Sequence, residues 1–111
     1  MGKLEQYRKW VQDLLTRYVQ EDVAEEGIEV QLVMDTVRDH YQWINVGWHG
    51  SDYVYDCYLH VDIKDGKVWI QRNWTEESPA EELIKMGIPR EDIVLGLQPP
   101  SNRPYTNYGI A

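Results

Sequence analysis

Hydrophobic residues follow two different periods along this chain, and the change of period divides it into a helix and a sheet. Over residues 3–20 they recur every three to four positions, which predicts an amphipathic helix with one buried side. After an acidic connector at 21–27, apolar and polar residues alternate, which predicts β-strands. The helical apolar stripe consists of Leu4, Tyr7, Val11, Leu14, Leu15 and Tyr18.

Four segments show the alternation, and short turns separate them. Asp65-Gly66 is typical of a type I′ hairpin turn, and Gly50-Ser51 of a type II′ turn. A three-residue loop within 37–41 would join the first two strands and would pair Met34 with Ile44. The predicted strands cover residues 29–36, 41–49, 53–63 and 67–74.

The three turns predict one register and send one set of apolar residues to a common core face. They pair Trp48 with Tyr53 beside one turn, and Ile63 with Val68 beside another. The predicted core face comprises Ile44, Val46, Trp48, Tyr53, Tyr55, Cys57, Leu59, Val61 and Ile63.

The last part of the chain predicts a short helix and a docked tail. In 78–89, Ser78 is the predicted N-cap with Glu81 completing a capping box, and Gly87 ends the helix. Residues 90–97 fit either a helical turn or a strand, and the tyrosines of 98–111 favour an ordered tail. The fold class is therefore α+β: one domain over residues 1–111, with an antiparallel meander of about four strands, an N-terminal helix packed on one face and a short C-terminal helix.

The charge and the cysteine content limit the classes of function and the cellular location that the chain can have. The net charge of −8 disfavours direct contact with a nucleic-acid backbone. One cysteine excludes an internal disulfide, and no signal peptide or membrane span is recognisable, so we expect a soluble cytoplasmic protein without membrane contact.

Three histidines suggest a site, but the predicted register separates them. His49 and His60 would lie roughly 26 Å apart at about 3.3 Å per residue. His40 would lie near His60 but point to the opposite face. We therefore expect no metal, no cofactor and no catalytic residues. The alternative is an acid/base pair of His60 and Asp62 in a small hydrolase or nuclease-like enzyme.

The predicted face opposite the core is rich in aromatic residues, as protein interfaces are. The register pairs Trp43 with Tyr58, and Tyr41 with His60, with Trp69 on the next strand. We expect these five residues to bind a partner protein. Two other interpretations stay open: the second helix or the C-terminal tail covers this face, or the face joins two copies of the chain as a homodimer.

The chain resembles the XisI family, the fdxN element excision controlling factors of cyanobacteria. The most specific segments are "LHVDIKDGKVWIQ" and "PREDIVLG", within 46–76 and 87–105, and the likeness extends over the whole chain. The resemblance implies a small α+β protein linked to programmed excision of a DNA element. It also implies a companion protein, XisH, and a site-specific recombinase that is contacted only indirectly.

The leading hypothesis is a non-enzymatic accessory protein that regulates a DNA-processing partner by protein–protein contact. Arg103 and Tyr105 in the Pro/Tyr-rich tail are further candidates for that contact. Direct DNA binding is a second alternative to the enzyme, and the acidic charge disfavours it.

Overall fold

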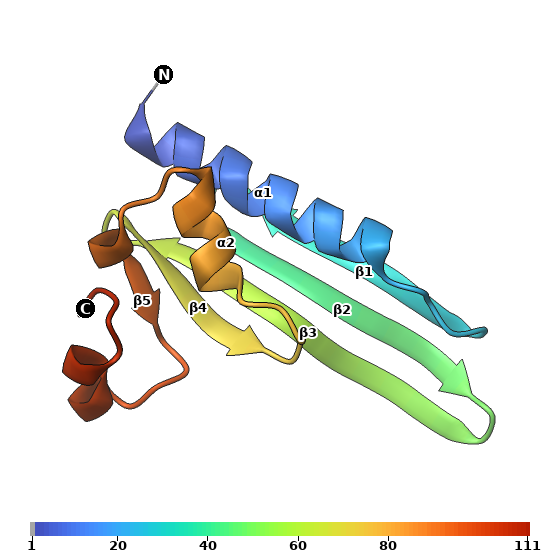
Figure 1. The fold of residues 1–111 in the computed structure, drawn as a ribbon. Coiled ribbons are helices and arrows are strands. Elements are labelled where there is room, and N and C mark those ends of the chain that lie inside the picture. The colour runs from blue at the N-terminus through green and yellow to red at the C-terminus, as the bar shows by residue number, and fades with distance from the viewer. Residues whose placement is uncertain (1) are drawn as a thin grey trace.

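A computed structural model describes residues 2–111, which form a twisted sheet with two helices on one face (Figure 1). Two 3₁₀ turns, Arg90–Asp92 and Pro100–Tyr105, flank the last strand. The elements in chain order are α1 (Lys3–Glu21), β1 (Ile28–Asp35), β2 (His40–His49), β3 (Asp52–Lys64), β4 (Lys67–Asn73), α2 (Pro79–Met86) and β5 (Ile93–Leu95).

The sheet has the strand order β1-β2-β3-β4-β5. The first four strands are an antiparallel meander, which confirms the predicted α+β class. The fifth strand, β5, lies parallel to β4, because α2 carries the chain back along the sheet between them. The meander of about four strands is thus extended by one short parallel strand from the ambiguous segment 90–97.

The core lies between the helices and the face of the sheet that they cover, which we call the helix face. Tyr7, Val11, Leu14, Leu15 and Tyr18 are all buried, so the predicted stripe of α1 is confirmed. α2 lies beside α1 and contributes Leu83 (Figure 1). No helix within residues 2–111 combines the length and the apolar character that a membrane crossing requires.

The two hairpin turns have the predicted geometry. Asp65 and Gly66 both have positive φ, 54° and 76°, as a type I′ turn requires. Gly50 has a φ of 63°, which fits the first central position of a type II′ turn. The strand pairs beside these turns are the predicted ones, including Trp48 with Tyr53 and Ile63 with Val68.

The connection between β1 and β2 is longer than predicted. Met34 pairs with Tyr41, so the predicted pairing of Met34 with Ile44 is wrong. The Asp35 carboxylate accepts hydrogen bonds from the backbone N–H groups of Val37 and Arg38, at 2.9 and 2.8 Å. This turn closes a four-residue loop between Asp35 and its strand partner His40.

A β-bulge at Tyr58 divides the predicted core face into two. Trp43 pairs with Leu59 and Ile44 with Cys57, so Tyr58 is an extra residue in β3. Beyond it, Leu59, Val61 and Ile63 are buried on the helix face, as predicted. Before it, the alternation is reversed, and the row predicted as core lies on the other side of the sheet, which we call the open face. That row comprises Ile44, Val46, Trp48, Tyr53, Tyr55 and Cys57.

α2 has the predicted ends but not the predicted capping box. Ser78 is the residue before the helix and Gly87 ends it with a φ of 131°, yet the Ser78 side chain makes no cap hydrogen bond. The Glu81 carboxylate is engaged elsewhere: it accepts hydrogen bonds from Tyr108 and Arg90. The Glu81 carboxylate therefore binds the C-terminal tail instead of completing the capping box.

The C-terminal segment is docked, as expected. The backbone N–H of Gly109 donates to the carbonyl oxygen of Ile93 at 2.7 Å, beside β5. Lys67 Nζ donates to the carbonyl oxygen of Ile110 at 2.8 Å. These contacts and the Tyr108–Glu81 hydrogen bond attach the last residues to β4, β5 and α2.

Candidate functional site

Two of the five predicted partner-binding residues lie in the core. Tyr41 is fully buried and Trp43 is 6% exposed, both on the helix face beneath α1. Their predicted place on a non-core face is wrong, because the longer β1–β2 loop and the Tyr58 bulge shift the alternation. Tyr58 does contact Trp43, with ring centroids 5.3 Å apart, but on the helix face. Tyr41 presents no surface to a partner in this conformation.

The other two predicted residues, His60 and Trp69, lie on the open face, as predicted. Trp69 is only 6% exposed, because the Lys64 ammonium and the Arg103 guanidinium lie over its ring, at 4.1 and 5.2 Å. The tail thus covers this part of the face. Arg103 is held by that packing, whereas Tyr105 is 87% exposed. Whether any of these residues contacts a partner stays a prediction.

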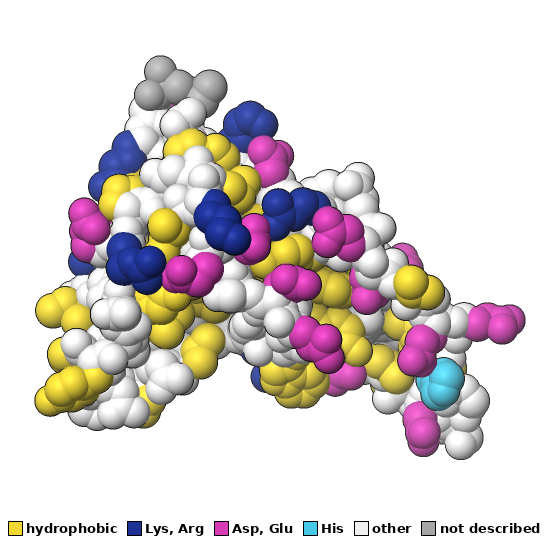
Figure 2. Space-filling model, viewed as in Figure 1, with side chains coloured by type: hydrophobic (Ala, Val, Ile, Leu, Met, Phe, Trp, Pro, Cys, Tyr) yellow, Lys and Arg dark blue, Asp and Glu magenta, His cyan; other side chains and the backbone are white. Residues whose placement is uncertain are grey.

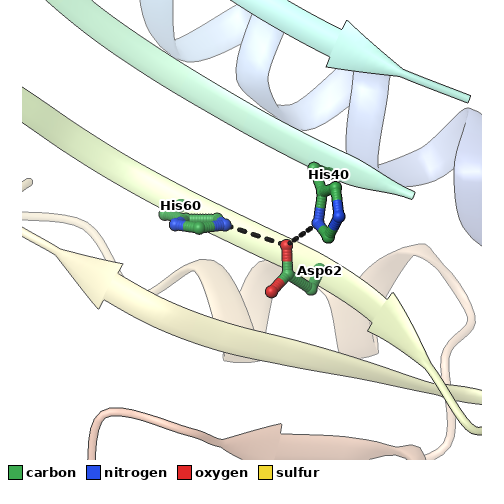
Figure 3. Close-up of side chains that lie close together, drawn as sticks. All are labelled: His40, His60 and Asp62. Carbon is green, nitrogen blue, oxygen red and sulfur yellow. Dashed lines mark hydrogen bonds and ion pairs between the residues drawn. The ribbon is translucent and has the colours of Figure 1, made fainter. Parts of the chain in front are cut away.

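The bulge brings together two histidines that were predicted to point apart. His40 Nδ1 and His60 Nε2 each lie 2.8 Å from Asp62 Oδ1, so one carboxylate oxygen joins the two rings (Figure 3). The predicted opposite orientation of His40 is wrong, since His40 pairs with Asp62 across the strands and shares its face. His49 lies at the far end of β2, beside Glu25, and is separate from this cluster, as predicted.

Hydrogen bonds keep the Asp62 carboxylate ionised. Burial alone would raise its pKa, but the hydrogen bonds from His40 and His60 outweigh burial and lower the pKa below its usual value. Gln71 Nε2 donates to the second oxygen, Oδ2, at 3.2 Å and fixes the orientation of the carboxylate.

The predicted acid/base pair of His60 and Asp62 therefore exists as a hydrogen bond. A hydrolase would also need a concave substrate site at this pair. Of the two main hollows in the described chain, neither is lined by His60 or Asp62.

The larger hollow lies on the helix face, beyond the end of α1, and we call it the aromatic groove. It has a volume of about 560 Å³ and is open to solvent. β2 and β3 form its floor, and the segments that follow α1 and β4 form its sides. Its aromatic lining consists of Tyr18, Trp43, Tyr58 and Trp74.

Acidic side chains surround the aromatic groove. Among the described residues that line it, none is Lys, Arg or His. Figure 2 shows Asp and Glu gathered around hydrophobic surface over the half of the molecule that holds the β2–β3 hairpin, with Lys and Arg mainly nearer α2 and the start of α1. The groove is therefore a site of negative potential with an aromatic floor. Its acidic residues are Glu21, Asp22, Glu25, Asp56, Glu76 and Glu77.

Two of the residues that line the groove carry buried polar groups. Asn45, 6% exposed, accepts a hydrogen bond from Trp43 Nε1 at 2.9 Å. The Tyr18 hydroxyl is buried without a hydrogen-bond partner in the described chain. Burial, with a smaller effect of Glu82 and Glu77, raises the pKa of Tyr18 to about 12, so the hydroxyl stays protonated. It remains able to donate and to accept.

The aromatic groove was not predicted from the sequence. The sequence predicts only an acidic connector at 21–27 and a short helix capped by Ser78, directly after Glu76-Glu77. One feature of the sequence could have indicated the groove. Each of the two acidic segments closely follows an aromatic residue near the end of a predicted helix or strand, Tyr18 in one case and Trp74 in the other. Only the sheet register places these two ends on the same side of the molecule.

Comparison with known proteins gives one consistent result. The model of the family described as XisI protein matches residues 1–110. A crystal structure of a XisI-like protein from Anabaena variabilis is 57% identical, with a TM-score of 0.94, over 97% of this chain and 99% of that chain. The crystal structure of fdxN element excision controlling factor XisI from Anabaena variabilis is 33% identical, with a TM-score of 0.89. The match covers 99% of this chain and 100% of that chain. No curated protein sequence matches the chain.

Proposed function

Because the chain belongs to the XisI family, we propose that it is a non-enzymatic accessory protein that regulates excision of a DNA element by binding a companion XisH-like protein. The crystal structure of the relative named as an excision controlling factor covers the whole fold, which supports a regulatory role. Any effect on a site-specific recombinase would pass through the companion. The observation that carries the mechanism is the aromatic groove, with six acidic residues and no basic one in its described lining.

The charge of the molecule favours a protein partner over DNA. A net charge of −8 repels phosphate backbones and attracts a protein whose DNA-facing surface is basic. Contact with such a surface would also compete with DNA for it. Regulation by occupying a basic surface requires no catalytic residue.

The aromatic groove fits a lysine- or arginine-bearing segment of that partner. A cation over the face of Trp or Tyr is attracted by the ring electrons, and the surrounding carboxylates add direct charge pairing. Trp74 is 55% exposed, and a partner cation would contact the part of the ring that Arg72 does not cover. The same chain already uses this geometry internally, where the Arg72 guanidinium lies 3.7 Å from the Trp74 ring centroid.

Co-expression with the companion XisH-like protein tests the proposal. We expect the two proteins to co-purify at low salt and to dissociate as salt increases, because the contact is largely electrostatic. A Trp74→Ala variant should be retained less. Absence of a complex at low salt would show that the proposed partner is wrong. Retention of this chain alone on duplex DNA, declining steeply with salt, would favour the direct DNA-binding alternative instead.

A further inference from the structure

We propose that His40, His60 and Asp62 form a binding site for one divalent transition-metal ion on the open face. Their donor atoms lie within 4.8 Å of one another, and both imidazole nitrogens face the same carboxylate oxygen (Figure 3). The site is separate from the aromatic groove, which lies on the helix face, and the inference does not depend on the proposed function.

The donor set selects the class of metal. Two imidazoles and one carboxylate suit Zn²⁺, Fe²⁺, Co²⁺ and Ni²⁺, whereas Mg²⁺ and Ca²⁺ prefer sites built from oxygen alone. Such a set leaves coordination positions free for water or another ligand.

The distances fit adjacent positions around one ion. Two ligands at about 2.0–2.1 Å from a metal are about 2.8–3.0 Å apart when they subtend 90° at the ion, and about 3.3–3.4 Å apart at the tetrahedral angle. His40 Nδ1 and His60 Nε2 are each 2.8 Å from Asp62 Oδ1. The two nitrogens must approach one another to complete the site. The His40 side chain can rotate to do so, since 56% of it is exposed.

Neighbouring groups prepare the ligands for binding. Gln71 donates to the Asp62 oxygen that does not face the histidines, which leaves Oδ1 directed at the proposed ion. Gln71 itself is an extra residue in β4, because Val61 pairs with Ile70 and His60 with Arg72. Two strand irregularities thus build the site: one puts both histidines on one face, and the other brings in the amide that orients the carboxylate.

Metal binding requires a specific tautomer of each ring. In the metal-free protein, the nitrogens that face Asp62 can donate to it. To bind a cation, those nitrogens must present lone pairs, so the proton of each neutral ring must move to His40 Nε2 or His60 Nδ1. Each ring then coordinates the metal through the nitrogen that now faces Asp62.

Titration calorimetry with Zn²⁺ on the full chain tests the inference, with Co²⁺ absorption spectra as a second readout. We expect one ion per chain, and affinity at least about tenfold lower in His40→Gln and in His60→Gln. Gln71→Leu should lose about tenfold as a positioning residue. Circular dichroism would establish that each variant is folded.

Two matched variants serve as controls. His49→Gln removes a histidine that pairs with Glu25 at the other end of the hairpin, and Cys57→Ser removes the one thiol of the chain. Both should bind Zn²⁺ as the wild type does. Equal affinity of the wild type and the folded His40 and His60 variants, loss of binding in His49→Gln alone, or no Zn²⁺ binding by the wild type would overturn the inference.

Discussion

Asp39 is a buried carboxylate that joins α1 to the sheet. It is 8% exposed and accepts hydrogen bonds from Arg8 Nε at 2.7 Å and from the Tyr41 hydroxyl at 2.9 Å. Burial raises the pKa of Asp39, but these hydrogen bonds outweigh burial and hold the pKa below its usual value. The stabilisation is therefore present above the unfolded pKa of about 3.9 and is lost as pH falls through the folded pKa.

Replacing Asp39 by Asn tests this contact. We expect Asp39→Asn to lower the free energy of unfolding at pH 7 by about 2 kcal/mol, because Arg8 loses its charged partner. Asn tolerates the positive φ of 62° at this position, so the backbone is not an added cost. Urea unfolding measures the difference, which should shrink as pH falls below about 4. A difference that is constant between pH 7 and pH 3 would contradict the assignment.

Trp43 and Trp74 both line the aromatic groove, but they differ in burial. Trp43 is 6% exposed and Trp74 is 55% exposed. Trp43→Ala should lower the free energy of unfolding by about 3–5 kcal/mol through a core cavity. Trp74→Ala should cost less than about 1 kcal/mol. Denaturant unfolding of both variants measures the two changes in the free energy of unfolding. Equal changes would contradict the placement of Trp43 in the core.

At the level of elements, Gly47 of β2 lies close against the backbone of Gly27, the residue before β1. A Cβ atom there would lie 2.0 Å from the carbonyl oxygen of Gly27, which is backbone and cannot rotate away. Gly50, in the hairpin turn, also has a positive φ, but a Cβ atom there would meet nothing within 4 Å. The two positions differ both in steric crowding and in φ, which is 149° at Gly47 and 63° at Gly50.

We expect Gly47→Ala to destabilise the protein by about 2 kcal/mol more than Gly50→Ala does. Thermal or urea unfolding of the two variants provides the comparison. The Gly50 variant measures the effect of a side chain at positive φ, about 1 kcal/mol. If both variants unfold alike, the close approach of Gly27 and Gly47 does not exist in solution.

The elements show what the sequence could and could not predict. The local hydrophobic period and the turn residues correctly predicted both helices and the strand pairs beside Gly50 and Gly66. The sequence did not predict which face of the sheet the helices cover. Before the bulge, both sides of β3 carry some aromatic or apolar residues, so neither side is marked as the core side. Nothing local in "YDCYLH" indicates that Tyr58 is an extra residue. β5 was missed as a definite strand because its parallel pairing with β4 is a long-range contact.

The candidate sites were harder to predict for the same reason. His60 with Asp62 was recognised as a pair on one strand, since residues two apart share a face. His40 was assigned to the wrong side, because the bulge changes the alternation between β2 and β3. The aromatic groove forms because the ends of α1 and β4 lie on the same side of the molecule. A single sequence does not predict the relative positions of these two ends.

At the scale of the whole molecule, the two faces of the sheet have different characters. The helix face carries the core and, beyond α1, the acidic aromatic groove. The open face carries the histidine cluster and an exposed apolar row in which Trp48, Tyr53 and Tyr55 are 58%, 56% and 66% exposed. The proposed partner contact and the proposed metal site therefore occupy opposite sides, and each can be changed without touching the other.

The affinity of the companion XisH-like protein for charge-reversal variants tests the central claim most directly. In Glu76→Lys/Glu77→Lys, two acidic residues of the groove become basic. In Glu5→Lys/Asp13→Lys, the net charge changes equally at two exposed positions of α1 that do not line the groove. We predict binding at least about tenfold weaker for the groove variant and within about threefold of wild type for the control. Equal weakening of both variants, or no weakening in the groove variant, would contradict the account.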